Sequence, residues 1–242
     1  MLKDHFGNEV TTNGLGSIET IDHFSNQLLR LGCETGQVLI AAEAFQETFL
    51  LQVYAALFYL FAQTEKGKCR ANHFLERSRR LLKTKPTERE LSIYEAVKLW
   101  SQGQLAETLS QLEKHCLKWR RDLVMLKVTE FIYYCKGQEY EGGRFLSLTQ
   151  NLYQKWKDDP FFLSMHSFAL ELTGNYSEAE VESNRALDLD NFNSWAHHTL
   201  CHVYINRGET EKGIKALESF VPIWNQSARV IQSHNLWHLA LM

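Results

Sequence analysis

The chain has 242 residues, of which 44% are hydrophobic and 23% charged, and its formal net charge is −3. This balance is ordinary for a soluble globular protein, and it predicts neither a nucleic-acid nor a membrane partner. The longest uncharged stretch, 48–64, is shorter than the ~20 residues that a membrane span needs. Only three prolines and little strand-type alternation predict an all-α protein.

The cysteines indicate a reducing compartment. They are odd in number, scattered and free of any CxxC pair, and they stand at Cys33, Cys69, Cys116, Cys135 and Cys201. That pattern suits free thiols better than a disulfide framework. The first residues contain no apolar signal-peptide segment, so we expect a cytoplasmic protein.

In chain order, we expect a polar lead over 1–16 and then a single helical domain over 17–242. The first helices are predicted over 17–31 (ended by Gly32), 38–63 (two helices with a break near Gln46) and 68–83 (Phe74, Leu75, Leu81 and Leu82 inward). The stretch 66–89 is rich in lysine and arginine. We interpret it as a solvated outer helix face, because no aromatic platform or nucleic-acid reading motif accompanies it.

Capping signals organise the next segments. Thr87-x-x-Glu90 is a capping box, in which the threonine oxygen accepts an amide and the glutamate reaches back to the cap. Asp159-Pro160 places proline in a first helical turn, and Ser177-x-x-Glu180 predicts another cap. Further helices are expected over 87–103, 104–118, 122–136, 138–155 and 161–173.

Five glycines mark a repeat. Gly67, Gly103, Gly137, Gly174 and Gly208 are 36, 34, 37 and 34 residues apart, and each lies between two segments of helical spacing. A period near 34 is typical of paired-helix solenoids, because one helical hairpin cannot bury its own apolar face. The pattern predicts a right-handed superhelical stack of about five helical hairpins.

Residues 160–222 are similar to the tetratricopeptide repeat. Small residues at Ala179 and Ala186 follow Gly174 at the offsets where that family's two helices cross, and Gly208, Gly213 and Phe220 take the matching places in the next copy. The best-matched repeats are 160–193 and 194–227, and the last repeat is incomplete. Asn191 stands where the consensus has proline, so the helix junction there needs other support.

Three longer motifs make the resemblance to tetratricopeptide proteins more specific. They are Thr87–Leu91 with Tyr94-Glu-Ala, Met165–Glu171 with Gly174-Asn-Tyr, and the pair Trp195–Val203 and His234–Leu241. Together they resemble the tetratricopeptide repeat protein 38 family over most of the chain. That resemblance implies the architecture and no established activity. Members of that family continue beyond the last motif, which implies a chain truncated at Met242 or covered there by self-association of its final helix.

Four histidines form two HxxxH pairs. His198 and His202 share one helix face, as do His234 and His238, and each of the second pair lies 36 residues after its counterpart. Stacked repeats are expected to bring the two pairs side by side. The tetratricopeptide resemblance places them in the concave groove with other residues, giving a groove set of Phe168, Glu171, Trp195, His198, His202, His234, Trp237 and His238.

Three interpretations of this set stay open. The histidines pack between helices with ring nitrogens bonded to Asn206, Asn235 or backbone carbonyls, or the groove binds a ligand without metal, or the four histidines bind zinc or iron, with Glu171 as a further ligand or as a general base. Cys201 beside His202 is interpreted as a core residue, since neighbours on a helix point about 100° apart.

The sequence therefore favours a protein- or peptide-binding scaffold that uses its concave groove, because solenoids present extended surfaces to partners. The alternative is a metal- or small-molecule-binding enzyme that uses the paired histidines and Glu171. No catalytic residue is assigned, because no catalytic motif outweighs the scaffold interpretation.

Overall fold

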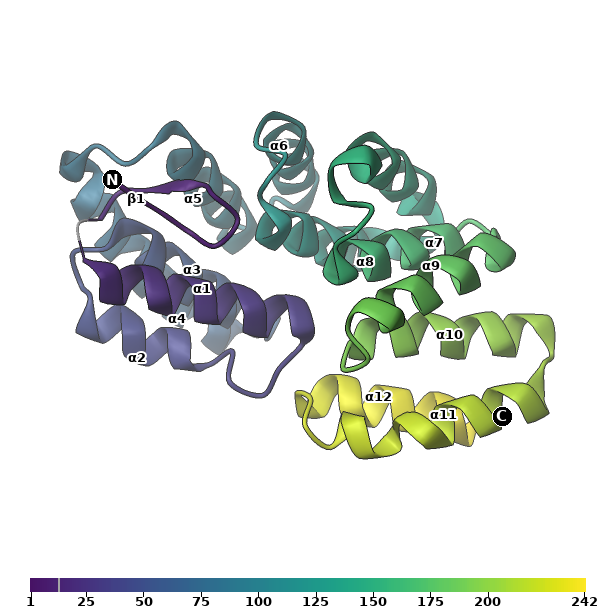
Figure 1. The fold of residues 1–242 in the computed structure, drawn as a ribbon. Coiled ribbons are helices and arrows are strands. Elements are labelled where there is room, and N and C mark those ends of the chain that lie inside the picture. Colours follow the sequence, from purple (N-terminus) through teal and green to yellow (C-terminus); the bar gives the residue numbers. More distant parts are fainter. Residues whose placement is uncertain (13) are drawn as a thin grey trace. The chain divides into compact units, whose positions relative to one another are not determined.

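The computed structural model describes residues 1–12 and 14–242, with the backbone alone for Glu139; Asn13, in the predicted polar lead, lies outside the described residues. Helices make up most of this part of the chain, and its one sheet is a two-stranded ribbon (Figure 1). The all-α prediction is confirmed. None of the described helices is long and apolar enough to cross a membrane.

The elements follow one another with short connections. The first are β1 (Leu2–Lys3), β2 (Glu9–Val10), α1 (Leu15–Arg30), α2 (Gln37–Ala44), α3 (Phe49–Leu60), α4 (Glu65–Arg80), the 3-10 helix η1 (Leu81–Thr84), α5 (Glu88–Ser101) and α6 (Leu105–Lys118). The rest are α7 (Leu123–Trp156), α8 (Pro160–Glu171), α9 (Tyr176–Leu189), α10 (Ser194–Arg207), α11 (Thr210–Trp224) and α12 (Arg229–Ala240).

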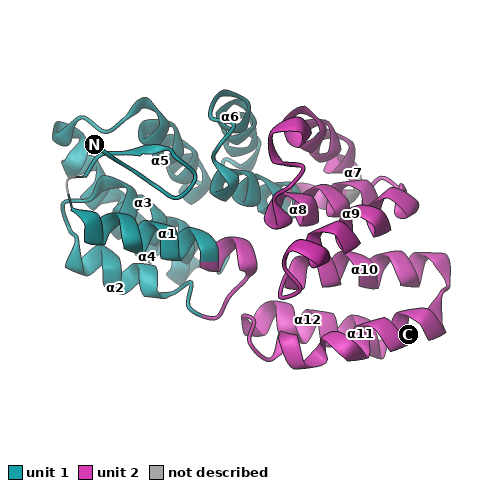
Figure 2. Cartoon of the chain, viewed as in Figure 1, with its two compact units in different colours: residues 1–26, 34–135 teal, residues 27–33, 136–242 magenta. Residues whose placement is uncertain are grey.

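The chain divides into two compact units (Figure 2). Unit 1 comprises residues 1–26 and 34–135, and unit 2 comprises 27–33 and 136–242. The boundary falls within α7, just before Gly137, whose φ of 110° interrupts the helix there. The two segments predicted on either side of that glycine are therefore joined through a kink.

Unit 1 is built around α3, whose residues are buried on nearly every face. The polar lead belongs to this unit: β1 and β2 pair antiparallel, with Leu2 opposite Val10. Thr11, directly after β2, donates its hydroxyl to Glu90 at 2.5 Å. Glu90 and Thr87 form the predicted capping box of α5, so this cap also holds the lead in place.

Unit 2 contains the helical hairpins α8–α9 and α10–α11. Gly174 and Gly208 have φ of 78° and 67° in the turns within these hairpins, a conformation that a side chain disfavours. Ala179 and Ala186 are buried on the inner face of α9, as the resemblance implied. Asp159 caps α8 by accepting the amide of Phe162, with Pro160 in the first turn, which confirms that prediction.

Several local predictions are wrong. Gly67 does not separate two helices: it lies in the first turn of α4, where its amide donates to the cap residue Thr64. Leu31, rather than Gly32, takes the left-handed conformation after α1, with φ of 54°. Leu82 is exposed, because η1 tightens the helix after Arg80 and turns that side chain outward.

The Ser177 cap is also wrong. The helix begins at Tyr176, two residues before the start that a Ser177 cap would give, and Asn175 occupies the cap position without a side-chain capping hydrogen bond. Ser177 instead accepts a hydrogen bond from Arg207, and Glu180 forms ion pairs with Arg207 and Lys212. The two polar residues link α9 to the next hairpin, so tertiary contacts replaced the local motif.

His166 gives unit 2 a pH-dependent stability. Burial lowers the pKa of this α8 histidine to about 4, below the ~6.5 of an unfolded chain. The unfolded state therefore binds more protons between these values, so stability is full above pH 6.5 and falls by about 1.4 kcal/mol per unit as the pH drops. We expect the advantage of the wild type over His166→Gln in urea unfolding to shrink by about 2 kcal/mol from pH 7 to 5. Parallel stability curves for the two proteins would contradict this.

Candidate metal centre

Helices α10 and α12 carry the two HxxxH pairs, and local contacts fix both helices. Asn193 caps α10 by accepting the amides of Trp195 and Ala196. At the start of α12, the amide of Ala228 donates to the carbonyl of Leu31. The buried side-chain amide of Asn235 then donates to the carbonyl of Ser194 at 3.1 Å. This bond connects the middle of α12 to the start of α10.

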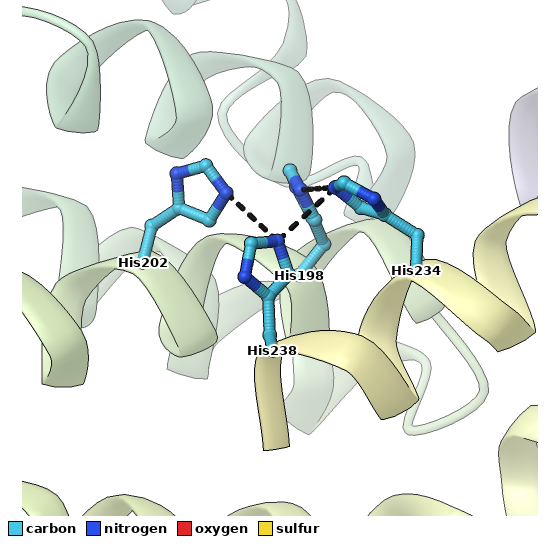
Figure 3. Close-up of side chains that lie close together, drawn as sticks. All are labelled: His198, His202, His234 and His238. Carbon is cyan, nitrogen blue, oxygen red and sulfur yellow. Dashed lines mark hydrogen bonds between the residues drawn. The ribbon is translucent and has the colours of Figure 1, made fainter. Parts of the chain in front are cut away.

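The four histidines of the two pairs converge in a single group, called here the histidine cluster (His198, His202, His234 and His238). Their rings meet between α10 and α12 with the Nε2 atoms turned inward (Figure 3). Nε2 of His234 lies 3.1 Å from that of His198 and 3.1 Å from that of His238. Nε2 of His238 lies 3.1 Å from that of His202. One nitrogen from each ring lies within 4.8 Å of the others.

Hydrogen bonds among the rings do not satisfy this arrangement. A neutral imidazole nitrogen carries either one hydrogen or one lone pair. Nε2 of His234 and Nε2 of His238 each have two close nitrogen neighbours. One hydrogen or one lone pair cannot point well at two neighbours, so at least one contact lacks a good hydrogen bond. A cation between the rings would accept a lone pair from every one of them.

The spacing and the ionisation state both fit a metal. Zinc bound to imidazole at 2.0–2.1 Å in a tetrahedron implies six nitrogen separations of roughly 3.3 Å; three of those in the cluster are 3.1 Å, and one nitrogen from each ring lies within 4.8 Å of the others. Burial, and then the charges of His202 and His234, lower the pKa of His238 to about 3. Burial also lowers the pKa of His234. These two imidazoles are therefore neutral at pH 7, which is the form that binds metal.

Glu171 stands behind the cluster rather than among its donor atoms. Its Oε1 lies 3.3 Å from Nδ1 of His202, the ring nitrogen on the far side from the cluster, and accepts a hydrogen bond from Asn206. A carboxylate in this place holds a ligand histidine in the tautomer whose Nε2 lone pair is free. The hypothesis that Glu171 is a ligand or a general base does not fit this geometry, because its contact is with Nδ1.

The buried charge of Glu171 also needs compensation. The residue is only 6% exposed, and its Oε2 has no hydrogen-bond partner among the described residues. A carboxylate in such surroundings is costly unless a positive charge lies near. A metal ion bound in the cluster, on the far side of the His202 ring that faces Glu171, would bring a positive charge near this carboxylate.

Aromatic side chains border the cluster. Trp195 stacks on His198 with ring centroids 4.4 Å apart, and Phe168 contacts both of these rings. Trp237 lies 5.0 Å from His238 and is 54% exposed. The structure thus brings all eight residues of the predicted groove set into one neighbourhood within unit 2.

Two other sequence interpretations have clear outcomes. Cys201 is buried, as expected of a core residue, and burial raises the pKa of its thiol, which removes it as a nucleophile. Asn206 and Asn235 do not bond to the histidine rings as the packing interpretation proposed. Asn206 donates to Glu171 and to the carbonyl of His202, and Asn235 donates to the carbonyl of Ser194.

Sequence reasoning missed a second polar group, in unit 1. His115 Nε2 lies 3.0 Å from an Asp122 oxygen, and its Nδ1 lies 3.0 Å from the hydroxyl of Ser92. This order resembles a catalytic serine triad, but Arg89 bonds the same Asp122 oxygen at 2.6 Å. That guanidinium neutralises the aspartate, and the imidazole is fully buried, so His115 is poorly placed to transfer protons to a substrate. We interpret the group as structural.

Arg89 corrects the interpretation of the basic stretch. It is only 4% exposed, although the sequence placed it on a solvated face. A signal was present: Arg89 shares a helical stripe with the apolar Ile93 and Ala96. A charge on such a stripe indicates a buried ion pair, and Asp122 is that partner.

No protein-family model matches the chain.

Proposed function

We propose that this chain is a metal-binding helical-repeat protein, whose histidine cluster holds one divalent first-row ion. The observation that carries the proposal is the convergence of four Nε2 atoms with 3.1 Å contacts, which hydrogen bonding among four rings satisfies poorly. Imidazole suits zinc, copper, iron and nickel, and the spacing supports zinc best, with iron as the alternative.

The buried carboxylate supports the same proposal independently. Glu171 contacts Nδ1 of His202 at 3.3 Å, the usual position of a carboxylate partner behind a metal-bound histidine. An ion in the cluster would compensate its charge. The proposal therefore explains two features with one ion: the crowding of the ring nitrogens and the burial of an acidic group.

Equilibrium titration with Zn²⁺ or Co²⁺ tests the proposal. We expect one ion per chain, bound tightly enough to resist gel filtration. Glu171→Gln should weaken binding about 10–100-fold, and His202→Gln should weaken it more, because it removes a ligand rather than a ligand's partner. His166→Gln is the matched control, since this histidine lies on the adjacent α8, bonds Thr149 and is outside the cluster. Equal affinity in all four proteins would refute the site.

A protein- or peptide-binding scaffold is the second candidate, and one observation favours it. Helix α12 and the residue that follows it leave large apolar side chains exposed, namely Val230, Leu236, Trp237 and Leu241. Such a patch suits a protein partner or self-association. Sedimentation of the wild type and of Val230→Glu distinguishes self-association from binding to another protein, because a dimer through α12 should dissociate in the variant.

The proposal extends to the repeat architecture, the family and the cellular location of the chain. The glycine turns and hairpins of unit 2 support a tetratricopeptide-like solenoid and a divergent member of the tetratricopeptide repeat protein 38 family. A cytoplasmic location stays a prediction. The exposure of Cys33 and Cys69 as free thiols supports it, because exposed thiols persist best in a reducing compartment.

A further inference from the structure

The ligands proposed for the metal leave its charge largely uncompensated. Four neutral imidazoles bring no negative charge to a divalent ion, and the carboxylate of Glu171 acts only through His202. The ion and this carboxylate together carry a net charge of about +1 in a partly buried site. Charge in such surroundings is costly, so the site favours one more anion.

The cluster is open on one side. His198 and His238 are buried, at 2% and 6% exposure, whereas His202 is half-buried and His234 is exposed. The 3.1 Å contacts join His198 to His234, His234 to His238 and His238 to His202, so the exposed His234 stands between the two buried rings. Zinc and the other first-row metals accept a fifth ligand when the surrounding side chains leave room for it. The exposed side at His234 is where such a ligand would enter.

The approach to that side is aromatic. The indole of Trp237 lies 5.7 Å from the His234 ring and is the most exposed aromatic group in contact with the cluster. Flat aromatic surfaces stack on planar organic groups and contribute about 0.5–1.5 kcal/mol per ring pair. A ligand with a planar aromatic body is therefore favoured over a small inorganic anion.

We propose that the metal centre binds an exchangeable aromatic carboxylate, with the carboxylate on the ion and the aromatic ring against Trp237. This inference rests on the proposed function, since it requires an ion in the histidine cluster. It makes the site a ligand-binding centre rather than a closed structural one. The indole of Trp237 then determines which anions are preferred.

The Co²⁺-loaded protein tests this, because the visible absorption of cobalt reports its coordination. We expect azide, acetate and benzoate each to change the spectrum saturably, with benzoate binding about 10-fold more tightly than acetate. That ratio corresponds to about 1.4 kcal/mol, one stacking contact. Trp237→Ala should bring the two affinities together.

The outcomes separate the two proposals. Tight Co²⁺ binding with a spectrum unchanged by all three anions would overturn this inference and leave the metal site standing. A saturable response with equal acetate and benzoate affinities would overturn the aromatic assignment. Failure of Co²⁺ to bind would overturn both.

Discussion

Zinc should raise the melting temperature of the protein, and a chelator should reverse the effect. Ligand that binds only the folded state at about 100 times its dissociation constant adds about 2.7 kcal/mol of stability. For a chain of this length, that corresponds to a shift of roughly 5–11 °C. Thermal melts followed by circular dichroism, with zinc and then with excess chelator, measure it.

The packing of α12 is the physical reason. The residues that this helix buries are Ile231, Asn235 and His238, so a single aliphatic side chain is among them. Full burial of one such side chain is worth about 1.5–3 kcal/mol, which is little for holding a helix of three turns. An ion with two ligands from α10 and two from α12 would join the helices directly. Metal binding and the docking of α12 should therefore be coupled.

Two variants make this melt specific. The double variant His202→Gln with His238→Gln removes one ligand from each helix and should lose the zinc-dependent shift. His166→Gln keeps the cluster and should retain it. A shift of equal size in the double variant would show that zinc acts elsewhere, for example at the exposed Cys33 or Cys69.

The histidine cluster could be predicted from the sequence because two spacings combine in it, one of four residues within each pair and one of 36 residues between the pairs. A spacing of four puts His198 and His202 on one face of α10, and the offset of 36 residues places His234 and His238 at the same spacing on α12, two helices later. The hairpin turns were predictable from glycines such as Gly174, whose left-handed conformation ends a helix. These are local signals, and local signals are what a sequence displays.

The features that the sequence did not reveal depend on contacts between distant residues. Glu171 was expected to act on the metal, but the distance to Nδ1 of His202 depends on how α8 packs against α10. Ser177 was expected to cap a helix, but its hydroxyl instead accepts a hydrogen bond from Arg207, which lies in the next hairpin. Arg89 looked solvated because its partner Asp122 is 33 residues away. No spacing rule encodes such pairs.

Neutralising Asp122 should cause the largest loss of stability in unit 1. Asp122 accepts hydrogen bonds from Arg89 at 2.6 Å, from His115 at 3.0 Å and from the amide of Met125 at 3.2 Å. Although burial opposes ionisation, Arg89 and His115 hold the pKa of this carboxyl well below its usual range. It therefore stays charged at neutral pH, and its stabilisation is lost only as the pH falls below about 3.9, the unfolded value.

Asp122→Asn preserves the shape of the side chain and removes its charge. The buried guanidinium of Arg89 then keeps only Asp4, at 3.6 Å, as an acidic partner among the described residues. Removing one member of a buried ion pair typically costs about 3–5 kcal/mol, because the remaining charge is left uncompensated. Urea unfolding at pH 7 should show a loss of that size.

The double variant Arg89→Met with Asp122→Asn separates charge from packing. It removes both charges, while the single amide oxygen at position 122 can still accept from the amide of Met125 and the amide nitrogen faces His115, whose Nε2 accepts in the other tautomer. We expect it to be more stable than Asp122→Asn alone by roughly 1–2 kcal/mol, since no buried guanidinium is stranded. If the double variant were instead the less stable of the two, Arg89 would stabilise unit 1 through its packing or through Asp4.

A loss under 1 kcal/mol in Asp122→Asn would mean that water or Asp4 compensates Arg89, and the ion pair would not be what anchors α5 to the start of α7.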